Sequence, residues 1–314
     1  MSKGASALWK ARHNLWLQYV RNTVRTVEAG RSIPLGPSRQ ALEAPRVLRR
    51  KRPPKSVLLC SPHPDDESLT GALPLRLRLE AGMRVVNCAI TLGSDTRQRG
   101  RRLAELESAC RVLGFELVVP GQSMGFDRVN AANRQEHPDE WMAKVEALGE
   151  VFEREKPDVV FAPHARDFNT THIGTHMLVV DALGAYLERH GSKLFPLIET
   201  EFWAELTQPN LMVGVSAEAL AVLLMAAAEH GAEMRRNPYC LLQPHRLMNN
   251  VRRGSEVVGR QGRPAKRYPF AELYRAVFLK GAKIVAPKPV TLMLDPGKKA
   301  DLSGIVGKFL PEEA

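Results

Sequence analysis

The residues with the greatest capacity for chemistry are His63, Asp65, Asp66 and Glu67, which crowd together directly after the apolar run 56–60. The run lies between prolines and predicts a short buried strand. Four ionisable side chains at the end of a buried strand are costly unless something binds them. The carboxyl ends of strands are also where open α/β sheets bind ligands. A solvated Pro-Asp turn would account for the same residues, so this cluster alone leaves both interpretations open.

A second polar cluster, 163–176, follows another apolar run, 158–162. It contains His172 and His176, which are four residues apart and share one face of a predicted helix. Such a pair is more often a solvated helix face than a pair of metal ligands. Two polar clusters that follow two parallel strands meet at one edge of the sheet, however, and that convergence favours a metal site.

The elements that must position these clusters alternate between strand and helix. Apolar runs predict strands at 56–60, 84–91, 115–119 and 158–162, and periodicity predicts helices that end at Gly82, at Gly114 and near Arg189. This alternation predicts an α/β fold with a mainly parallel sheet and helices on both faces. Beyond residue 195 the pattern predicts strands near 197–203 and 211–214, a helix over 217–230, a helix near 270–280 and a short strand around 283–293.

The N-terminal part differs from the rest in charge. Residues 1–55 hold 13 Lys/Arg and 2 Asp/Glu, which accounts for the whole net charge of +11. An apolar stripe that includes Trp9 and Trp16 predicts a helix over 5–29, and Pro, Gly and the basic run 49–54 predict a linker. We therefore expect a basic helical arm at 1–54, a globular domain at 55–285 and a C-terminal extension at 286–314.

Composition narrows the class of protein. The four cysteines show no C-x-x-C spacing, so we interpret them as apolar core residues in a reducing compartment rather than as a zinc knuckle or a disulfide framework. No apolar run approaches the length of a membrane span, and no signal-peptide pattern is present. We expect a cytoplasmic protein. The arm lacks a pattern of stacking aromatic residues, which favours a structural or anionic-surface role over specific nucleic-acid binding.

The sequence resembles the PIG-L/LmbE superfamily of zinc-dependent N-acetylglucosaminyl deacetylases. The matching features are SPHPDDE at 61–67, Thr-Leu-Gly at 91–93, a helix that starts Arg102-x-x-Glu105-Leu and closes with Leu113-Gly114, and FAELYR at 270–275. The resemblance covers about 55–285 and implies a Rossmann-like α/β sheet.

The resemblance also implies roles for individual residues. His63, Asp66 and His172 would bind zinc or another divalent metal, and Asp65 would be the general base. The second motif of the family usually reads H-x-D-H, and here Asn169 stands at the position of its first histidine. The oxyanion-stabilising role of that histidine is thereby left to Asn169, His164 or His230, and the candidate catalytic residues are Asp65, Asn169 and His176.

The chemistry of the residue types agrees with this assignment. Two imidazoles and a carboxylate leave an open zinc position for a water molecule, whose pKa falls to about 7. The adjacent Asp65 can take the proton of that water and pass it to the leaving amine. For Glu67 two roles stay open: a charge at a helix N-terminus, or a partner of a metal ligand.

The candidate substrate-binding residues are Arg102, Asp127 and His230. Arg102 belongs to a group of arginines that follows the second strand, where it would bind a phosphate or an anionic sugar or begin a solvated helix. Asp127 lies in a Gly-Phe-Asp-Arg stretch that resembles a substrate loop of the family and is equally typical of a plain turn.

The expected function is hydrolysis of the acetamide of an N-acetylated amino sugar of the N-acetylglucosamine type, free, conjugated or derived from an envelope glycan. Two alternatives remain: a non-catalytic glycan-binding or scaffold protein of the same fold, and a non-haem iron enzyme with a two-histidine, one-carboxylate site. The predicted parallel sheet opposes the iron enzyme.

Overall fold

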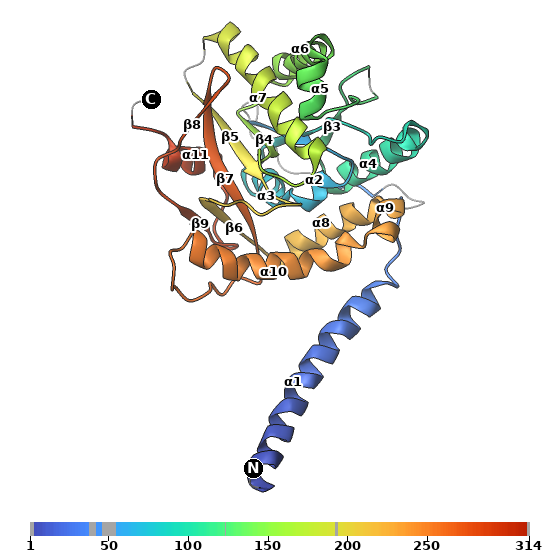
Figure 1. Cartoon of the computed structure of the whole chain (residues 1–314), viewed down its shortest axis with the longest axis vertical. Helices are drawn as coiled ribbons and strands as arrows, with labels where there is room; N and C mark the ends of the chain where they lie inside the picture. Colours follow the sequence, from blue (N-terminus) through green and yellow to red (C-terminus); the bar gives the residue numbers. More distant parts are fainter. Residues whose placement is uncertain (1–2, 38–41, 46–54, 123, 192–193, 313–314) are drawn as a thin grey trace.

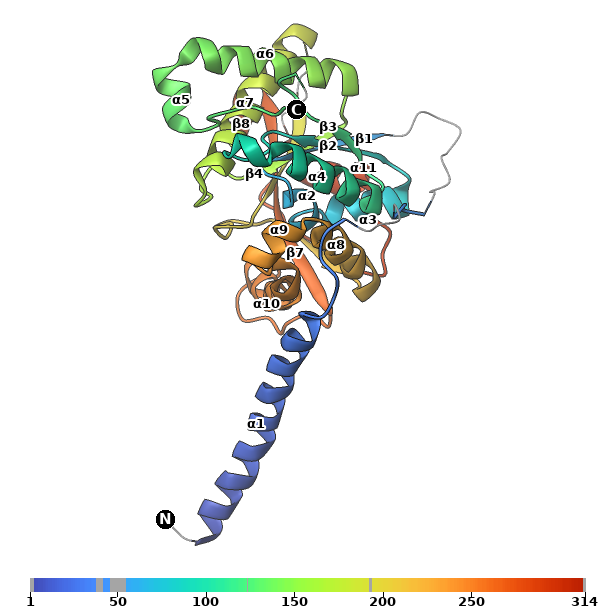
Figure 2. The ribbon, with the colours of Figure 1, turned by 90° about the vertical axis from the view of Figure 1, so that its right-hand side faces the viewer.

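The computed structural model describes residues 3–37, 42–45, 55–122, 124–191 and 194–312. It consists of an α/β body and one long helix, α1 (Lys3–Gly30), that extends away from the body in both views (Figures 1 and 2). Helix α1 confirms the helix predicted over 5–29. The predicted basic linker run 49–54 lies outside the described residues.

One half of the sheet is parallel and carries the two polar clusters. Its strands are β1 (Ser56–Ser61), β2 (Arg84–Ala89), β3 (Glu116–Val118), β4 (Val159–Pro163) and β5 (Phe195–Thr200), in the order β3-β2-β1-β4-β5. Val57 of β1 is paired with Val85 on one side and Val159 on the other. Because β1 and β4 are parallel neighbours, their carboxyl ends lie side by side.

The other half of the sheet is mixed. It contains β6 (Leu211–Val215), β7 (Phe270–Lys280), β8 (Lys283–Val285) and β9 (Leu292–Leu294), with β7 antiparallel to both β5 and β6. In the described part of the chain all nine strands belong to one sheet. The mostly parallel α/β architecture that the sequence predicts is confirmed.

The helix predicted near 270–280 is wrong, because this segment is the long strand β7. Successive side chains of β7 point to opposite faces: Tyr274, Ala276 and Phe278 enter one apolar core and Val277 and Leu279 the other. Since both faces are buried, the sequence lacks the polar alternation that marks a half-exposed strand, and an apolar run of this kind is easily mistaken for a helix.

Helices cover both faces of the sheet. The helices are α2 (Asp66–Leu69), α3 (Ala72–Ala81), α4 (Arg99–Leu113), α5 (Ala131–Glu136), α6 (Pro138–Glu155), α7 (Thr170–His190), α8 (Ala217–Glu229), α9 (Gly231–Arg236), α10 (Tyr239–Val257) and α11 (Leu302–Phe309), with a 3-10 turn at Thr96–Gln98. Side chains of α3, α4, α8 and α11 fill the core on one face, and those of α6 and α7 fill the core on the other. Gly82 and Gly114 adopt the left-handed conformation that ends α3 and α4, as predicted.

Strand β7 fixes the segment that follows the first polar cluster. The hydroxyl of Tyr274 donates to the carbonyl of Thr70 (3.1 Å) and accepts from the backbone N–H of Leu73 (2.9 Å). Glu272 accepts from the N–H of Ala72 (3.0 Å). These buried bonds satisfy N–H groups at the start of α3 that have no partner inside the helix, so the mixed half of the sheet helps to hold the loop of the parallel half.

The cysteines are Cys60, Cys88, Cys110 and Cys240, and all four are free and buried, in agreement with their interpretation as core residues. Among the described residues no helix combines the length and apolar character that crossing a bilayer requires.

Candidate metal centre

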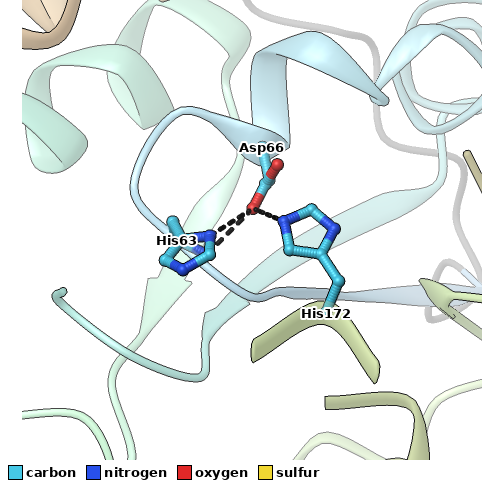
Figure 3. Close-up of side chains that lie close together, drawn as sticks. All are labelled: His63, Asp66 and His172. Carbon is cyan, nitrogen blue, oxygen red and sulfur yellow. Dashed lines mark hydrogen bonds and ion pairs between the residues drawn. The ribbon is translucent and has the colours of Figure 1, made fainter. Parts of the chain in front are cut away.

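The structure brings His63, Asp66 and His172 together at the carboxyl ends of β1 and β4 (Figure 3). His63 and Asp66 come from the loop that links β1 to α2, and His172 lies in the first turn of α7. Their potential ligand atoms all lie within 4.8 Å of one another. The convergence that the sequence predicts for the two polar clusters is therefore present in the fold.

The geometry and chemistry of the three side chains fit a divalent metal. Oδ2 of Asp66 lies 3.4 Å from Nδ1 of His63 and 3.3 Å from Nε2 of His172. Ligand atoms about 2.0–2.1 Å from a tetrahedral zinc ion are separated by about 3.3–3.4 Å. Nε2 of His172 is fully buried, and its contact with Oδ2 of Asp66 lacks the geometry of a hydrogen bond, an arrangement that is costly in a protein without a bound ligand.

The electrostatics of the cluster favour a cation at this position. Burial alone would raise the pKa of Asp66, but His172 and His63 outweigh that effect and hold it well below its usual range. Burial would likewise lower the pKa of His172, whereas Asp66 and Asp167 raise it to about 10. Asp66 and Asp167 thus stabilise a positive charge at the position of His172. A divalent metal would supply that charge in place of the imidazole proton, which it would release on binding.

Asp167 is a functional candidate that the sequence analysis missed. Its side chain is fully buried, and Oδ2 lies 3.5 Å from Nδ1 of His172, on the ring edge opposite Nε2. Oδ1 accepts the N–H of Asn169 (2.9 Å). A carboxylate on the far nitrogen of a histidine fixes the ring and its tautomer when the other nitrogen binds a metal. The position of Asp167, five residues before His172, follows no helix or strand period, so no sequence pattern pointed to it.

Asp65 borders the cleft next to Asp66 and has an unusual backbone conformation. Its φ is 120° and its ψ is −28°, a region that residues with a side chain rarely adopt. Its carboxyl group is buried, and burial together with Asp66 and Glu67 raises its pKa well above the ordinary value, with Arg102 opposing the shift. A raised pKa makes a carboxylate a stronger proton acceptor.

Glu67 supports the conformation of Asp65. One of its oxygens, Oε2, accepts the N–H of Asp65 (2.9 Å), and Oε1 lies 2.7 Å from Nε2 of His230. Glu67 and His230 are both essentially inaccessible to solvent. Of its two predicted roles, Glu67 does lie in the first turn of α2, but its carboxylate is bonded to the backbone of Asp65 and to His230. His230 borders a smaller hollow next to the cleft and is not among the side chains that line the cleft itself.

The other candidates of the second cluster occupy different positions. Asn169 lines the cleft, and its Oδ1 caps α7 by accepting the N–H groups of Thr171 (2.9 Å) and His172 (3.4 Å). His176 is buried one turn further on, and its Nδ1 donates to the carbonyl of Pro163 (2.9 Å); it does not line the cleft. His164 is buried, with Nε2 3.1 Å from the carbonyl oxygen of Ala204.

The cleft beside His63, Asp66 and Asp65 has a volume of about 630 Å³. Arg102 and Asp127, the candidate substrate-binding residues, both line it. Asp127 pairs with the buried Arg99, whose Nε also donates to the carbonyl of Gly93 (3.1 Å). Arg102 donates to the carbonyl of Pro64 (3.3 Å).

An aromatic group forms another part of the wall and was not foreseen from the sequence. Phe202, Trp203 and Tyr239 line the cleft and pack edge to face, with ring centroids 5.4–6.1 Å apart. Trp203 is 46% exposed, so part of its ring is available to a ligand.

Comparisons with known proteins agree with this architecture. Residues 58–183 match the family model described as PIG-L, GlcNAc-PI de-N-acetylase. This range runs from β1 into α7 and contains both polar clusters, so the resemblance seen in the sequence is confirmed. No curated protein matches the chain significantly.

Solved structures with the same fold include a protein with no stated activity, a deacetylase and a hydratase. The conserved protein TT1542 from Thermus thermophilus has 19% identity and a TM-score of 0.54, with 78% of this chain and 99% of that chain covered. The N,N'-diacetylchitobiose deacetylase from Pyrococcus horikoshii has 16% identity and a TM-score of 0.51, with coverages of 72% and 84%. GalB from Pseudomonas putida KT2440, a 4-carboxy-2-hydroxymuconate hydratase, has 17% identity and a TM-score of 0.50, with coverages of 74% and 100%. These similarities establish the fold; because the fold serves both deacetylases and a hydratase, the reaction must be argued from the site.

Proposed function

We propose that this protein is a divalent-metal-dependent deacetylase that hydrolyses the acetamide of an N-acetylated amino sugar of the N-acetylglucosamine type or of its conjugate. The observation that carries the proposal is the cluster of His63, Asp66 and His172 beside a second carboxylate, Asp65, in one cleft. The match of residues 58–183 to the PIG-L model supports the same reaction class.

The three ligands and the free carboxylate have distinct tasks. A zinc ion, or another divalent metal, would lower the pKa of a bound water and polarise the acetamide carbonyl. Asp66 contributes its charge to the metal site, while Asp65 accepts the proton of the attacking water and then donates it to the leaving amine. Asp167 keeps the ring of His172 oriented with Nε2 toward the cluster.

Asn169 is the candidate donor to the developing oxyanion. Its Oδ1 is already engaged in capping α7, which turns the side-chain amide so that the NH2 group is the part left for a ligand in the cleft. A neutral amide in place of an imidazole supplies a hydrogen bond without a charge, and such donors act most strongly where charge develops in the transition state.

The cleft supports an amino sugar as the substrate class. An exposed aromatic ring such as Trp203 packs against the apolar C–H face of a pyranose, while Asp127 and Arg102 provide an acceptor and a donor for its hydroxyl groups. Mixed apolar and polar walls of this kind orient a ligand by a few polar contacts.

The experiment that tests the proposal couples metal analysis to a substrate screen. Purified full-length protein, loaded with zinc and separately stripped with a chelator, is incubated with a panel of N-acetylated sugars, and released acetate is measured. We expect release by the zinc-loaded protein alone, on at least one sugar. The His172→Ala variant should lose both bound metal and activity, whereas His190→Ala, at an exposed position of the same helix, should retain both.

Two outcomes would contradict the proposal. Metal binding and sugar binding without any acetate release would indicate a glycan-binding protein of this fold. Full activity in the stripped protein, or in metal-free His172→Ala, would place the chemistry elsewhere.

A further inference from the structure

Helix α1 presents an uncovered apolar surface to the solvent. It is 28 residues long, or about 42 Å at 1.5 Å per residue, and it stands away from the body (Figures 1 and 2). Seven of its large apolar side chains are 51–69% exposed: Leu8, Trp9, Leu15, Trp16, Tyr19, Val20 and Val24. An apolar surface of this length normally has a partner.

The apolar side chains are gathered on one half of the helix. At 3.6 residues per turn, the seven exposed apolar residues fall within about half of the circumference, and Lys10, Arg21 and Arg25 fall on the other half. The ring of Trp9 stacks on His13 (4.8 Å between centroids), and Trp16 meets Tyr19 edge to face (6.0 Å). Helix α1 is thus an amphipathic helix with an aromatic apolar face and a basic polar face.

The body does not cover this face, but it does hold the base of the helix. Gly30 lies against Leu241 of α10 so closely that a Cβ would be 2.7 Å from its side chain. The N–H of Gly36 donates to the carbonyl of Ala228 at the end of α8 (2.7 Å), and Arg235 donates to the carbonyl of Leu35 (3.5 Å). The helix is therefore attached to α8, α9 and α10 at its C-terminal end, while its apolar face remains open along its length.

Charge distinguishes between two possible partners, a second copy of the chain and a lipid surface. The described side chains of α1 include four basic residues and only one acidic residue, Glu28. The basic residues are Lys10, Arg12, Arg21 and Arg25. Lys10, Arg21 and Arg25 lie outside the apolar half and would stay solvated in a helix pair, so Arg12 is the residue that distinguishes the two partners. Arg12 in particular lies within the apolar half, where a helix pair would bury it without a carboxylate, a costly arrangement. At a bilayer surface the same side chain can extend to lipid phosphates while its stem stays in apolar contact.

We propose that α1 binds anionic lipid bilayers, lying in the plane of the interface with its aromatic face toward the acyl chains and its basic residues among the headgroups. Tryptophan and tyrosine are the residues that prefer this depth. Basic residues near the surface of an anionic leaflet strengthen such binding, and residues 31–55 add eight Lys/Arg against one Asp/Glu. This binding is independent of the deacetylase function proposed for the cleft.

Vesicle flotation of the full-length protein tests the charge contribution. Phosphatidylcholine vesicles with phosphatidylglycerol should carry the protein, vesicles of phosphatidylcholine alone should carry much less, and high salt should release it. The variant Lys10→Glu/Arg21→Glu/Arg25→Glu should bind at least about 100-fold more weakly. As a matched control, Lys280→Glu/Lys283→Glu/Lys308→Glu changes three exposed lysines of the body and should bind like the parent.

Tryptophan fluorescence tests the apolar face in the unsubstituted protein. Brominated lipids should quench the emission of Trp9 and Trp16 when anionic vesicles are added, and the Trp9→Ala/Trp16→Ala variant should lose this quenching and bind at least about 10-fold more weakly. Circular dichroism and a thermal melt establish that each variant keeps the folded body.

Three results would overturn the proposal. They are failure of the parent protein to float with anionic vesicles, equal binding by the charge-reversal variant, and absence of quenching on binding. A concentration-dependent dimer that dissociates in Trp9→Ala/Trp16→Ala, without vesicle binding, would identify a second copy of the chain as the partner instead.

Discussion

A buried Glu–His pair lies behind each of the two segments that form the candidate metal centre, the loop with His63 and Asp66 and the loop leading into α7 with His172, and the two pairs differ. Behind the first loop, Glu67 and His230 are 2.7 Å apart, and the second oxygen of Glu67 holds the N–H of Asp65. Behind the second loop, Glu199 and His176 are 3.8 Å apart, and Oε2 of Glu199 has no hydrogen-bond partner. His176 instead uses its Nδ1 to bond a backbone carbonyl.

The difference follows from the number of charges that each loop carries. The first loop holds Asp65, Asp66 and Glu67 in consecutive positions, so mutual repulsion has to be offset by hydrogen bonds and by nearby cationic groups. The second cluster contributes one candidate ligand, His172, in the first turn of α7, whose position is fixed by the helix cap of Asn169 and by Asp167. The loop with three consecutive acidic residues is thus backed by the hydrogen-bonded pair Glu67–His230. The segment with His172 is held by the N-terminus of α7 and is backed by the more widely spaced pair Glu199–His176.

The largest expected effect is on the chemical step, which belongs to the first loop. Asp65→Asn removes the proton acceptor and keeps the side-chain shape, so acetate release at equal metal occupancy should fall by about two to four powers of ten. Metal content should be unchanged. Under the same conditions, Asn169→Ala in the second cluster should lose less of the acetate-releasing activity. Near-parental activity in metal-loaded Asp65→Asn would show that Asp65 is not the proton acceptor.

The next effect is on the stability of the protein and tests the pair Glu67–His230. Glu67→Ala leaves His230 and the N–H of Asp65 without their buried acceptor, so the free energy of unfolding should fall by about 3–5 kcal/mol. Urea unfolding measures it. Glu67→Gln, which keeps an acceptor oxygen, should cost less. If Glu199→Ala proves as costly as Glu67→Ala, the contrast between a tight and a loose pair does not hold.

The loose pair should make stability depend on pH. Burial raises the pKa of Glu199 to about 7, with Arg275 only partly opposing it, whereas the unfolded value is about 4.3. The folded state then binds more protons than the unfolded state between these values, so stability falls as pH rises from about 4.3 to 7. Glu199→Gln should remove up to about 4 kcal/mol of this decline. Unfolding curves of parent and variant with parallel pH slopes would contradict the prediction.

The smallest effect in this series concerns the orientation of His172. Asp167→Asn weakens the partner of Nδ1 and should lower metal affinity by about 10–100-fold, measured by competition with a chelating dye. Asp139→Asn, at an exposed position in the first turn of α6, is the matched control and should leave affinity unchanged. Equal affinity in Asp167→Asn would mean that the helix alone positions the ring.

The first loop was predictable from the sequence because its functional residues are contiguous and follow a clear strand. The alternation of the parallel half placed the carboxyl ends of β1 and β4, and so His172, at one edge of the sheet, whereas the fact that the two strands are neighbours came from the structure. Asp167 has no such pattern, since a single carboxylate in a polar loop carries no periodicity. The aromatic wall was equally hidden, because Trp203 and Tyr239 are far apart in the sequence and meet only through the fold.

The mixed half of the sheet was predicted less well. Strand β7 is buried on both sides, so its apolar run carries no period that separates strand from helix. Helix α10 was not predicted, and it contains Pro244, a residue that normally argues against a helix interior. In both segments tertiary packing outweighs the local signal.

The strained backbone conformation of Asp65 affects which substitutions selection can favour in this protein. At a φ of 120° a glycine would be relaxed where aspartate is strained, so Asp65→Gly should relieve this strain and favour the folded state while abolishing the proposed proton transfer. Selection for thermal robustness and selection for turnover therefore oppose each other at this one position. A library screened only for resistance to heat would be expected to accumulate inactive proteins changed at residue 65.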